Sequence, residues 1–264
     1  MNKKYIFMDL DGTIINHGHN GIMPSTLYAI QELQKNGHEV IIATGRPPAL
    51  FFDVDKKLGI KSYIAANGAL AIHNGEIILN KTIDKKHIDM LINFSIENRI
   101  DLGFESMTHF CLFSHNTNLP DKFCEAFHLP DPELLPDHYK DNDIYQMVLF
   151  YSGKDFKKFE YKFEGLWFNY SNKYGLDVNN ENGLKDAGLI AFHDVLGVSQ
   201  DDMIAIGDGF NDITMIEYAG IGIAMGNANE SVKEKADIVT DRIENNGLYK
   251  VFVELGLIKK ADYK

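Results

Sequence analysis

Phe7-Met8-Asp9-Leu10-Asp11-Gly12-Thr13 is the stretch that decides the predicted fold. Its first residues close a short, continuous apolar run, which is typical of a strand buried on both faces of a parallel sheet. In extended backbone, residues i and i+2 point the same way, so Asp9 and Asp11 are expected to face one point at the strand's carboxyl end. Gly12 lets the chain leave the strand sharply, and Thr13 can offer a hydroxyl and an N–H to an anion.

The two carboxylates indicate a bound cation and allow a particular chemistry. They would repel each other unless a cation lay between them, and hard oxygen ligands favour Mg²⁺ or Ca²⁺ over zinc. One carboxylate could attack phosphorus to form an aspartyl-phosphate, while the other could donate a proton to the leaving oxygen and later accept one from water. The motif alone leaves an ordinary alternative open, namely a strand end with two solvated acids and a turn glycine.

A second acidic cluster, Gly207-Asp208-Gly209-Phe210-Asn211-Asp212, also follows a buried apolar run. Asp208 is expected at the strand end and Asp212 in the first turn of the next helix. Two anionic strand ends that meet over one sheet edge are costly without a metal and reasonable with one. Taken alone, Asp212 could instead complement the dipole at the start of that helix.

The chain on both sides of these motifs predicts an α/β protein with an insertion. Apolar runs that end in polar residues alternate with helical patterns in the first 80 residues and again after residue 182, which predicts a doubly wound, mostly parallel, Rossmann-like sheet. We therefore assign residues 1–80 and 182–264 to a catalytic core. The expected strands lie at 5–8, 40–43, 63–66, 203–206, 221–225 and 238–239, and the expected helices at 24–35, 47–58, 184–196 and 211–219.

Residues 81–181 have a different pattern of strand-like and helical segments, and they are predicted to form an inserted α+β domain. Strand-like segments occur here in pairs with helical patterns between them, which favours antiparallel pairing. Residues 116–143 are rich in Pro and Asp and lack periodicity. The expected strands lie at 102–104, 109–113, 145–151, 166–170 and 174–178, and the expected helices at 86–99 and 154–163. The residues of this insert that could face a substrate, although ordinary surface or core positions explain them more readily, are Glu105, His109, Tyr145 and Gln146.

Thr44-Gly45-Arg46 and Lys185 can supply the donor and positive groups that an anionic substrate needs. Thr44 stands at a predicted strand end just before a helix, where hydroxyl and N–H groups can bind a phosphate oxygen. Lys185 could neutralise a phosphate and a carboxylate together. Judged from the residues alone, Lys173 could serve instead, and Arg46 could simply be solvated.

Taken together, these segments resemble the four motifs of the haloacid dehalogenase superfamily, in the family's order. Ala66-Asn67-Gly68-Ala69 and Ile223-Ala224-Met225-Gly226-Asn227-Ala228 resemble further hallmarks of its Cof-type branch, which carries a class IIB cap where the insert is predicted. The resemblance covers essentially the whole chain. It implies a phosphomonoester hydrolase that uses Mg²⁺ and acts on a small phosphorylated metabolite, such as a sugar phosphate. The alternatives are a phosphomutase or phosphotransferase with the same aspartyl-phosphate, and a regulatory protein that binds metabolites.

The resemblance also implies a role for each matching residue. Asp9 would be the nucleophile and a metal ligand, and Asp11 would be the general acid and base with its backbone carbonyl on Mg²⁺. Lys185 would be catalytic and would help to hold the transferring phosphoryl group. It is chosen over Lys173 because its spacing from Asp177-Val178 resembles the third motif, with Asp186 where the family usually has glycine. The remaining positions are the phosphate-binding Thr44, Gly45 and Asn211, the metal ligand Asp208, Asp212, which would bind the metal directly or through water, and the possible substrate-binding Arg46 and Asn67.

The composition of the chain disfavours several other classes of protein. The 264 residues carry a formal net charge of −12, which disfavours nucleic acid as a partner. Two cysteines cannot form a disulfide framework, so a reducing cytoplasm is expected. No signal sequence or apolar stretch of membrane length is evident, and a monomer or small homo-oligomer is expected. Neither a serine nucleophile nor a zinc site has a matching motif, and scattered histidines such as His17 and His19 are expected on the surface.

Overall fold

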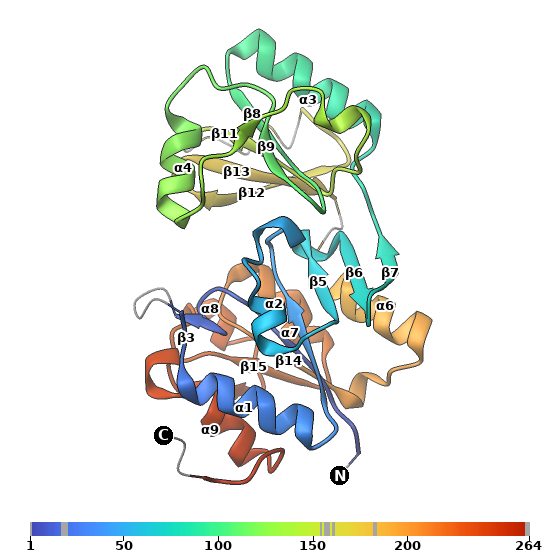
Figure 1. Cartoon of the computed structure of the whole chain (residues 1–264), viewed down its shortest axis with the longest axis vertical. Coiled ribbons are helices and arrows are strands. Elements are labelled where there is room, and N and C mark those ends of the chain that lie inside the picture. Colours follow the sequence, from blue (N-terminus) through green and yellow to red (C-terminus); the bar gives the residue numbers. More distant parts are fainter. Residues whose placement is uncertain are drawn as a thin grey trace. The chain divides into compact units, whose positions relative to one another are not determined.

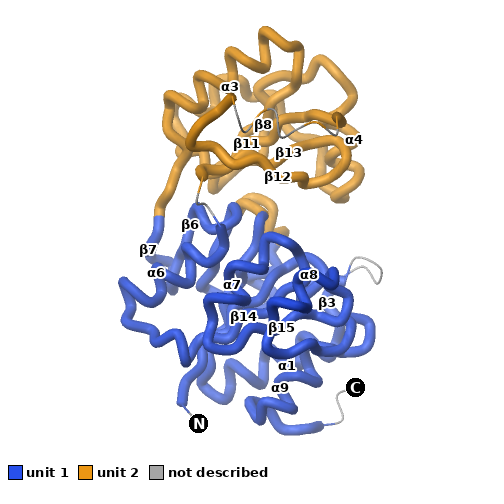
Figure 2. The backbone as a smooth tube through the Cα atoms, turned by 180° about the vertical axis from the view of Figure 1, so that it is seen from behind, with its two compact units in different colours: residues 1–45, 53–79, 184–264 blue, residues 46–52, 80–183 orange. Residues whose placement is uncertain are grey.

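The chain forms two compact units. A computed structural model describes residues 2–16, 21–153, 155, 159, 162–181 and 184–261. Unit 1 comprises residues 1–45, 53–79 and 184–264, and unit 2 comprises residues 46–52 and 80–183 (Figure 2). Unit 1 is therefore assembled from distant parts of the sequence. His17, His19 and most of the helix predicted at 154–163 lie outside the described residues.

Unit 1 contains a mostly parallel sheet, and its described residues form eight strands in the order β16-β15-β14-β1-β4-β5-β6-β7 (Figure 1). From β1 the sheet extends through β4 and β5 on one side and through β14, β15 and β16 on the other, all parallel. β6 is antiparallel to β5. These findings confirm the predicted α/β class and its mostly parallel sheet. The strands are β1 (Tyr5–Met8), β4 (Glu39–Ala43), β5 (Tyr63–Ala65), β6 (Leu70–His73), β7 (Glu76–Asn80), β14 (Met203–Gly207), β15 (Ile221–Ala224) and β16 (Ile238–Val239).

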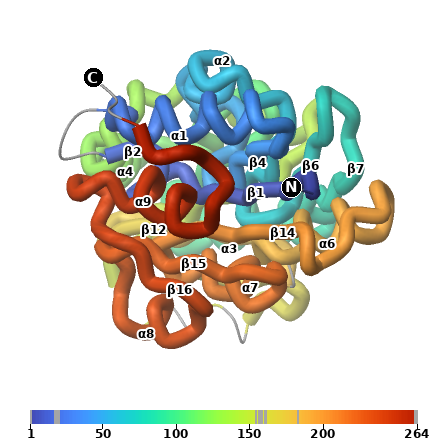
Figure 3. The backbone as a smooth tube through the Cα atoms, turned by 90° about the horizontal axis from the view of Figure 1, so that it is seen from below, coloured from blue at the N-terminus to red at the C-terminus, as the bar shows by residue number. Residues whose placement is uncertain are grey.

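Helices cover both faces of this sheet because successive residues of a strand point to opposite sides. Ile6 and Met8 of β1 pack in the layer that contains α1 and α9, which lie side by side (Figures 1 and 3). Phe7 packs in the opposite layer, with residues of α6 and α7. Burying each such side chain stabilises the fold by roughly 1.5–3 kcal/mol. The packing of both layers therefore fixes the position of β1 and of the residues that follow it. The helices are α1 (Pro24–Lys35), α2 (Val54–Leu58), α6 (Asp186–Leu196), α7 (Ile213–Tyr218), α8 (Glu230–Lys233) and α9 (Gly247–Glu254).

The structure corrects the helix predicted at 47–58. That segment forms a short 3-10 turn, η2 (Pro48–Leu50), followed by α2. Phe52 and Asp53 interrupt it with left-handed φ values of 50° and 59°, which a right-handed helix cannot accommodate.

Other differences concern short elements. The strand predicted at 63–66 ends at Ala65, because Ala66 has a φ of 48°. The helix predicted at 211–219 is a 3-10 turn, η6 (Phe210–Asp212), that leads into α7. Several strands have no predicted counterpart because short segments carry no recognisable period; they are β2 (Ile15–Asn16), β3 (Gly21–Ile22), β6 and β7.

Unit 2 is an α+β unit built on a mostly antiparallel sheet, whose described residues form six strands in the order β10-β9-β8-β11-β13-β12. One face packs against α3 and the other against α4, with Met147 and Val148 of the central strand pointing to opposite cores. Residues 116–143, predicted to lack periodic structure, contain α4 and β10. The elements are α3 (Lys85–Asn98), β8 (Asp101–Glu105), β9 (Phe110–Leu112), α4 (Leu119–Phe127), β10 (Glu133–Leu134), β11 (Gln146–Phe150), β12 (Leu166–Asn172) and β13 (Gly175–Asn180). Within the described residues of the chain, no helix is both long and apolar enough to cross a membrane.

Candidate active site

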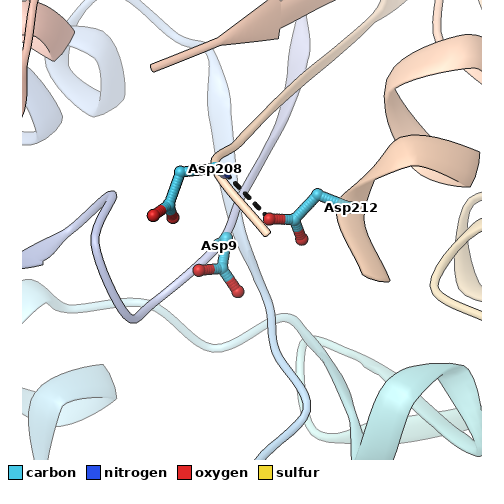
Figure 4. Close-up of side chains that lie close together, drawn as sticks. All are labelled: Asp9, Asp208 and Asp212. Carbon is cyan, nitrogen blue, oxygen red and sulfur yellow. Dashed lines mark hydrogen bonds between the residues drawn. The ribbon is translucent and has the colours of Figure 1, made fainter. Parts of the chain in front are cut away.

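Parallel strands bring the two acidic segments to one edge of the unit 1 sheet. β1 pairs with β14, with Met8 opposite Ile206, so the residues that follow these strands leave the sheet next to each other. The backbone N–H of Asp9 donates to the carbonyl of Ile206 over 2.9 Å. Asp9, Asp208 and Asp212 gather at this edge (Figure 4), and one carboxylate oxygen of each lies within 4.8 Å of the others.

Asp212 is held in this group by backbone donors. Its Oδ2 accepts hydrogen bonds from the N–H groups of Asp208 (2.9 Å) and Gly209 (2.8 Å). The side chain is fully buried, and its second oxygen, Oδ1, faces Lys185. Gly207 leaves room for this arrangement, because a Cβ there would lie 2.3 Å from the carboxylate carbon of Asp212.

Lys185 links two of the three carboxylates. Its Nζ donates to Asp9 Oδ1 (2.6 Å) and to Asp212 Oδ1 (2.5 Å), and the side chain is completely buried. Burial alone would lower the pKa of Lys185, but the carboxylates of Asp212 and Asp9 outweigh it and raise the pKa above its ordinary value. Lys173, the competing lysine of the sequence, lies in unit 2, exposed and over the ring of Tyr174 at 4.8 Å.

The cluster carries more negative than positive charge. Burial raises the pKa of Asp9 well above its ordinary value, and the carboxylates of Asp212, Asp208 and Asp11 add to this effect against the opposing ammonium of Lys185. Burial and the carboxylate of Asp212 likewise raise the pKa of Asp208 to about 6. Three clustered carboxylates share one ammonium, so a divalent cation would relieve their repulsion. Carboxylate oxygens are also the ligands that Mg²⁺ accepts, so the donor set fits this ion.

Asp208 is oriented by two side chains from other loops. Thr13 Oγ1 donates to its Oδ1 over 3.2 Å, and Asn227 Nδ2 donates to its Oδ2 over 3.1 Å. Asn227 also donates to the carbonyl of Gly12 over 2.9 Å, which ties the loop after β15 to the loop after β1. Gly12 has a φ of +85°, and a Cβ there would lie 2.3 Å from Asp208 Oδ2. Sequence reasoning noted the segment around Asn227 as a family hallmark but assigned no role to this side chain.

The predicted phosphate-binding residues form a connected group beside the carboxylates. Asn211 Nδ2 donates to Asn67 Oδ1 over 2.9 Å, and the backbone N–H of Asn67 donates to the carbonyl of Thr44 over 3.2 Å. A Cβ at Gly45 would lie 2.9 Å from Asn67 Oδ1, so glycine permits this close approach. Asn67 is buried with a left-handed φ of 53°. Its position favours a role in orienting Asn211.

Asp11 and Arg46 stand outside the group of three carboxylates. Asp11 is partly exposed, pairs through its backbone with Ile15, and acts on Asp9 through its charge. Arg46 belongs to unit 2, where its Nη1 donates to the carbonyl of Leu50 over 3.0 Å and its guanidinium lies 5.6 Å from the ring centre of Phe52. These contacts stabilise the turn in which Arg46 lies. The sequence had left open a side chain that is simply solvated.

The candidate residues of unit 2 fall into two groups. Gln146 Nε2 donates to Glu105 Oε2 over 2.8 Å, and Asn179 Nδ2 donates to Gln146 Oε1 over 2.9 Å, which forms a buried polar row across β8, β11 and β13. His109 lies in the loop before β9, with its ring 5.0 Å from that of His138. Tyr145 lines a cavity of about 710 Å³ between the start of α3, the β8–β9 turn and residues 139–144.

The buried row predicts a pH-dependent effect of Glu105→Gln. Burial, with a contribution from Asp177, raises the pKa of Glu105 well above its ordinary value of 4.5. The folded protein therefore binds the carboxyl proton of Glu105 more tightly than the unfolded chain does. The free energy of unfolding falls as pH rises from about 4.5 to the raised pKa of Glu105. Because Gln cannot titrate, we expect the variant to gain melting temperature relative to wild type over this window.

Thermal melts from pH 4.5 upward would measure this difference. Glu97→Gln on the exposed side of α3 is the matched control, and it should follow the wild-type curve at every pH. A constant offset between Glu105→Gln and wild type at all pH values would contradict the assigned cause.

Comparisons with known proteins agree with this fold. A model of the haloacid dehalogenase-like hydrolase family matches residues 6–252. The chain therefore belongs to the haloacid dehalogenase-like hydrolase family. This match confirms the superfamily inferred from the motifs. The enzyme class is confirmed as well, because similar proteins that span the chain are named phosphatases.

Three similar proteins span almost the whole chain. The Bacillus subtilis protein named "Putative phosphatase YkrA" is 33% identical over 261 residues, which are 98% of this chain and 100% of that protein. The 5-amino-6-(5-phospho-D-ribitylamino)uracil phosphatase YcsE of Bacillus subtilis is 30% identical over 258 residues, 94% of this chain and 93% of YcsE. The solved structure of BT4131, described as a subclass IIB sugar phosphatase, has a TM-score of 0.84 and 27% identity, and the match covers 97% of this chain and 100% of that one.

Proposed function

We propose that this protein is a Mg²⁺-dependent phosphomonoesterase that transfers the phosphoryl group of a small metabolite first to Asp9 and then to water. The observation that carries the proposal is the buried ion-pair cluster at the sheet edge, in which Lys185 joins Asp9 to Asp212 beside Asp208. Such a cluster combines a carboxylate nucleophile, a fixed positive charge and oxygen ligands within one small volume.

The resemblance to the family assigns the roles of the two aspartates, and general chemistry describes each step. An oxygen of Asp9 attacks phosphorus in line as the bond from phosphorus to the ester oxygen breaks, and Asp11 gives a proton to that leaving oxygen. Asp11 then takes a proton from water, whose oxygen attacks the aspartyl-phosphate and releases inorganic phosphate. Lys185 offsets the negative charge on the phosphoryl group throughout.

The metal and the phosphoryl group would each have their own ligands. Asp9, Asp208 and Asp212 would hold Mg²⁺ through carboxylate oxygens, with the backbone carbonyl of Asp11 as a further ligand. When bound, the ion would neutralise charge on the phosphoryl oxygens. The residues proposed to hold the phosphoryl group are Thr44, Gly45 and Asn211.

The substrate is proposed to be a small phosphorylated metabolite such as a sugar phosphate. Two of the similar proteins named above act, by their printed names, on a 5-phospho-D-ribitylamino compound and on sugar phosphates. We further propose that the inserted α+β domain determines specificity, that Arg46 and Asn67 are near the substrate, and that the protein works in the cytoplasm as a monomer or small homo-oligomer. The net charge of −12 argues against nucleic acid as a substrate.

Removal of the metal tests the cofactor and the cluster together. In chelator we expect phosphate release from an aryl phosphate to fall at least about 100-fold, because the excess negative charge of the site then repels the substrate. Added Mg²⁺ should restore activity and raise the melting temperature by several degrees, because it binds only the folded site. Colorimetric phosphate assays and thermal melts measure both effects.

Asp208→Asn provides the matched control for the metal. This variant should lose the Mg²⁺-dependent rise in melting temperature, whereas Asp194→Asn on the exposed side of α6 should keep it. Full activity in chelator would refute the cofactor assignment. Isomerised substrate without free phosphate would instead identify a phosphomutase.

A further inference from the structure

Asn227 is a half-buried residue whose side-chain amide is bonded at both its nitrogen and its oxygen. Its Nδ2 donates to Asp208 Oδ2 over 3.1 Å and to the carbonyl of Gly12 over 2.9 Å. Its Oδ1 accepts the backbone N–H of Ile243 over 3.1 Å. An amide nitrogen carries two hydrogens, so one is available for each of the two acceptors. The amide therefore joins the loops after β1 and β14 to the segment that precedes α9.

The bond from Ile243 fixes the direction in which this amide points. A backbone N–H can only donate, so the amide oxygen must face it. The NH₂ group then faces the carboxylate of Asp208 and the carbonyl of Gly12, which can only accept. Ile243 is only 4% exposed, and the N–H of Gly226 donates to the carbonyl of Asp241 over 3.1 Å. The support of the amide thus belongs to the packed part of unit 1.

The two acceptors of the amide belong to two parts of the proposed metal site. Asp208 is a proposed carboxylate ligand, and Thr13 Oγ1 donates to its other oxygen over 3.2 Å. Gly12 directly follows Asp11, whose backbone carbonyl is a further proposed ligand. Ligands that are already held in place lose little conformational entropy when an ion binds. Bonds that fix Asp208 and the turn at Gly12 before the ion arrives should therefore strengthen its binding.

We propose that Asn227 is a positioning residue for the metal, and that its amide sets the affinity of the site for Mg²⁺ by holding Asp208 and the turn at Gly12. This inference rests on the proposed phosphatase function and goes beyond it, because it assigns control of metal affinity to a side chain that is not a proposed ligand. Replacement of a residue that orients a metal ligand typically weakens metal binding by about 10- to 100-fold.

Calorimetric titration of the metal-free protein with magnesium chloride tests the inference. For Asn227→Leu, which keeps the size of the side chain and removes both donors, we expect Kd to rise at least about tenfold. The smaller variant Asn227→Ala should also raise Kd. At a fixed Mg²⁺ concentration, the rise in melting temperature should be smaller in both variants than in wild type. Excess Mg²⁺ should restore most of kcat for an aryl phosphate, because the bound ion orders the same ligands.

Asn229→Leu is the matched control, two residues further along the same loop. Asn229 is exposed, and its side chain makes no capping bond to α8. This variant should bind Mg²⁺ with the wild-type Kd. An equal rise of Kd in Asn229→Leu and Asn227→Leu would assign the effect to the loop as a whole and overturn the role of the amide.

The other outcomes separate this inference from the function on which it rests. Wild-type protein that binds no Mg²⁺ would refute the cofactor assignment itself. Wild-type protein that binds Mg²⁺, together with Asn227 variants that bind it with the same Kd, would overturn the role of Asn227 and leave the phosphatase intact. A merely structural role would lower the melting temperature of the metal-free variants and leave Kd unchanged, which would also count against the inference.

Discussion

Replacing Asp9 with Asn is expected to lower kcat/KM for an aryl phosphate by at least about 10⁴-fold. The amide of Asn has no charge and cannot form the acyl-phosphate bond. The fold should survive the change, because burial already disfavours the charged form of Asp9, as its raised pKa shows. Phosphate release and thermal melts would be measured on the same preparation, and Asp194→Asn should match wild type in both.

Rapid quenching with a substrate labelled in its phosphate adds a direct readout of the intermediate. Wild-type protein should carry label after precipitation in acid, and Asp9→Asn should carry none, because the label is bonded to the Asp9 oxygen. Near-wild-type turnover by Asp9→Asn would exclude this residue as the nucleophile.

Replacing Lys185 with Met is expected to lower the free energy of unfolding by about 3–5 kcal/mol in chelator. The change leaves the buried carboxylates of Asp9 and Asp212 without their shared ammonium, which lies 2.6 Å and 2.5 Å from them. Activity should also fall at least about 10³-fold, because this charge offsets that of the phosphoryl group in the transition state. Urea unfolding followed by circular dichroism would measure the first effect, and phosphate release the second.

Two variants make the Lys185 experiment specific. Lys173→Met removes an exposed lysine of unit 2 and should change stability by less than about 0.5 kcal/mol. The double variant Lys185→Met, Asp212→Asn removes one of the unpaired carboxylates and should recover part of the lost stability. If Lys185→Met unfolds no more easily than Lys173→Met, the buried ion pairs do not stabilise the fold.

The fold class could be predicted because its signal is local. β1, β4 and β14 are short apolar runs, and a strand buried on both faces shows this composition wherever it occurs. The prediction of one helix at 47–58 was wrong because the cause of the interruption does not lie in the local sequence. Phe52 and Asp53 adopt left-handed conformations that their residue types do not require, so only their surroundings in the folded chain can impose them.

The site could be predicted in part for a similar reason. The residues that follow neighbouring parallel strands must meet at one edge, so the approach of Asp9 to Asp208 follows from topology. Asn227 could not be found in this way. Its bonds to Gly12 and Asp208 join the loop after β15 to the loops after β1 and β14. The resemblance marked its segment, but the residue type carries no signal of these contacts.

The sequence by itself determined which chemical groups stand at the strand ends and in what order, because those features depend on residue type and short-range period. The resemblance to the family favoured Lys185 over Lys173 by its spacing, but only the tertiary structure shows the contact of Lys185 with the carboxylates, since the two lysines are equivalent as isolated charges. Electrostatic attraction depends on distance in space and on the exclusion of water, not on separation along the chain. Lys185 is 176 residues from Asp9 in sequence and 2.6 Å from it in the fold, where both side chains are buried.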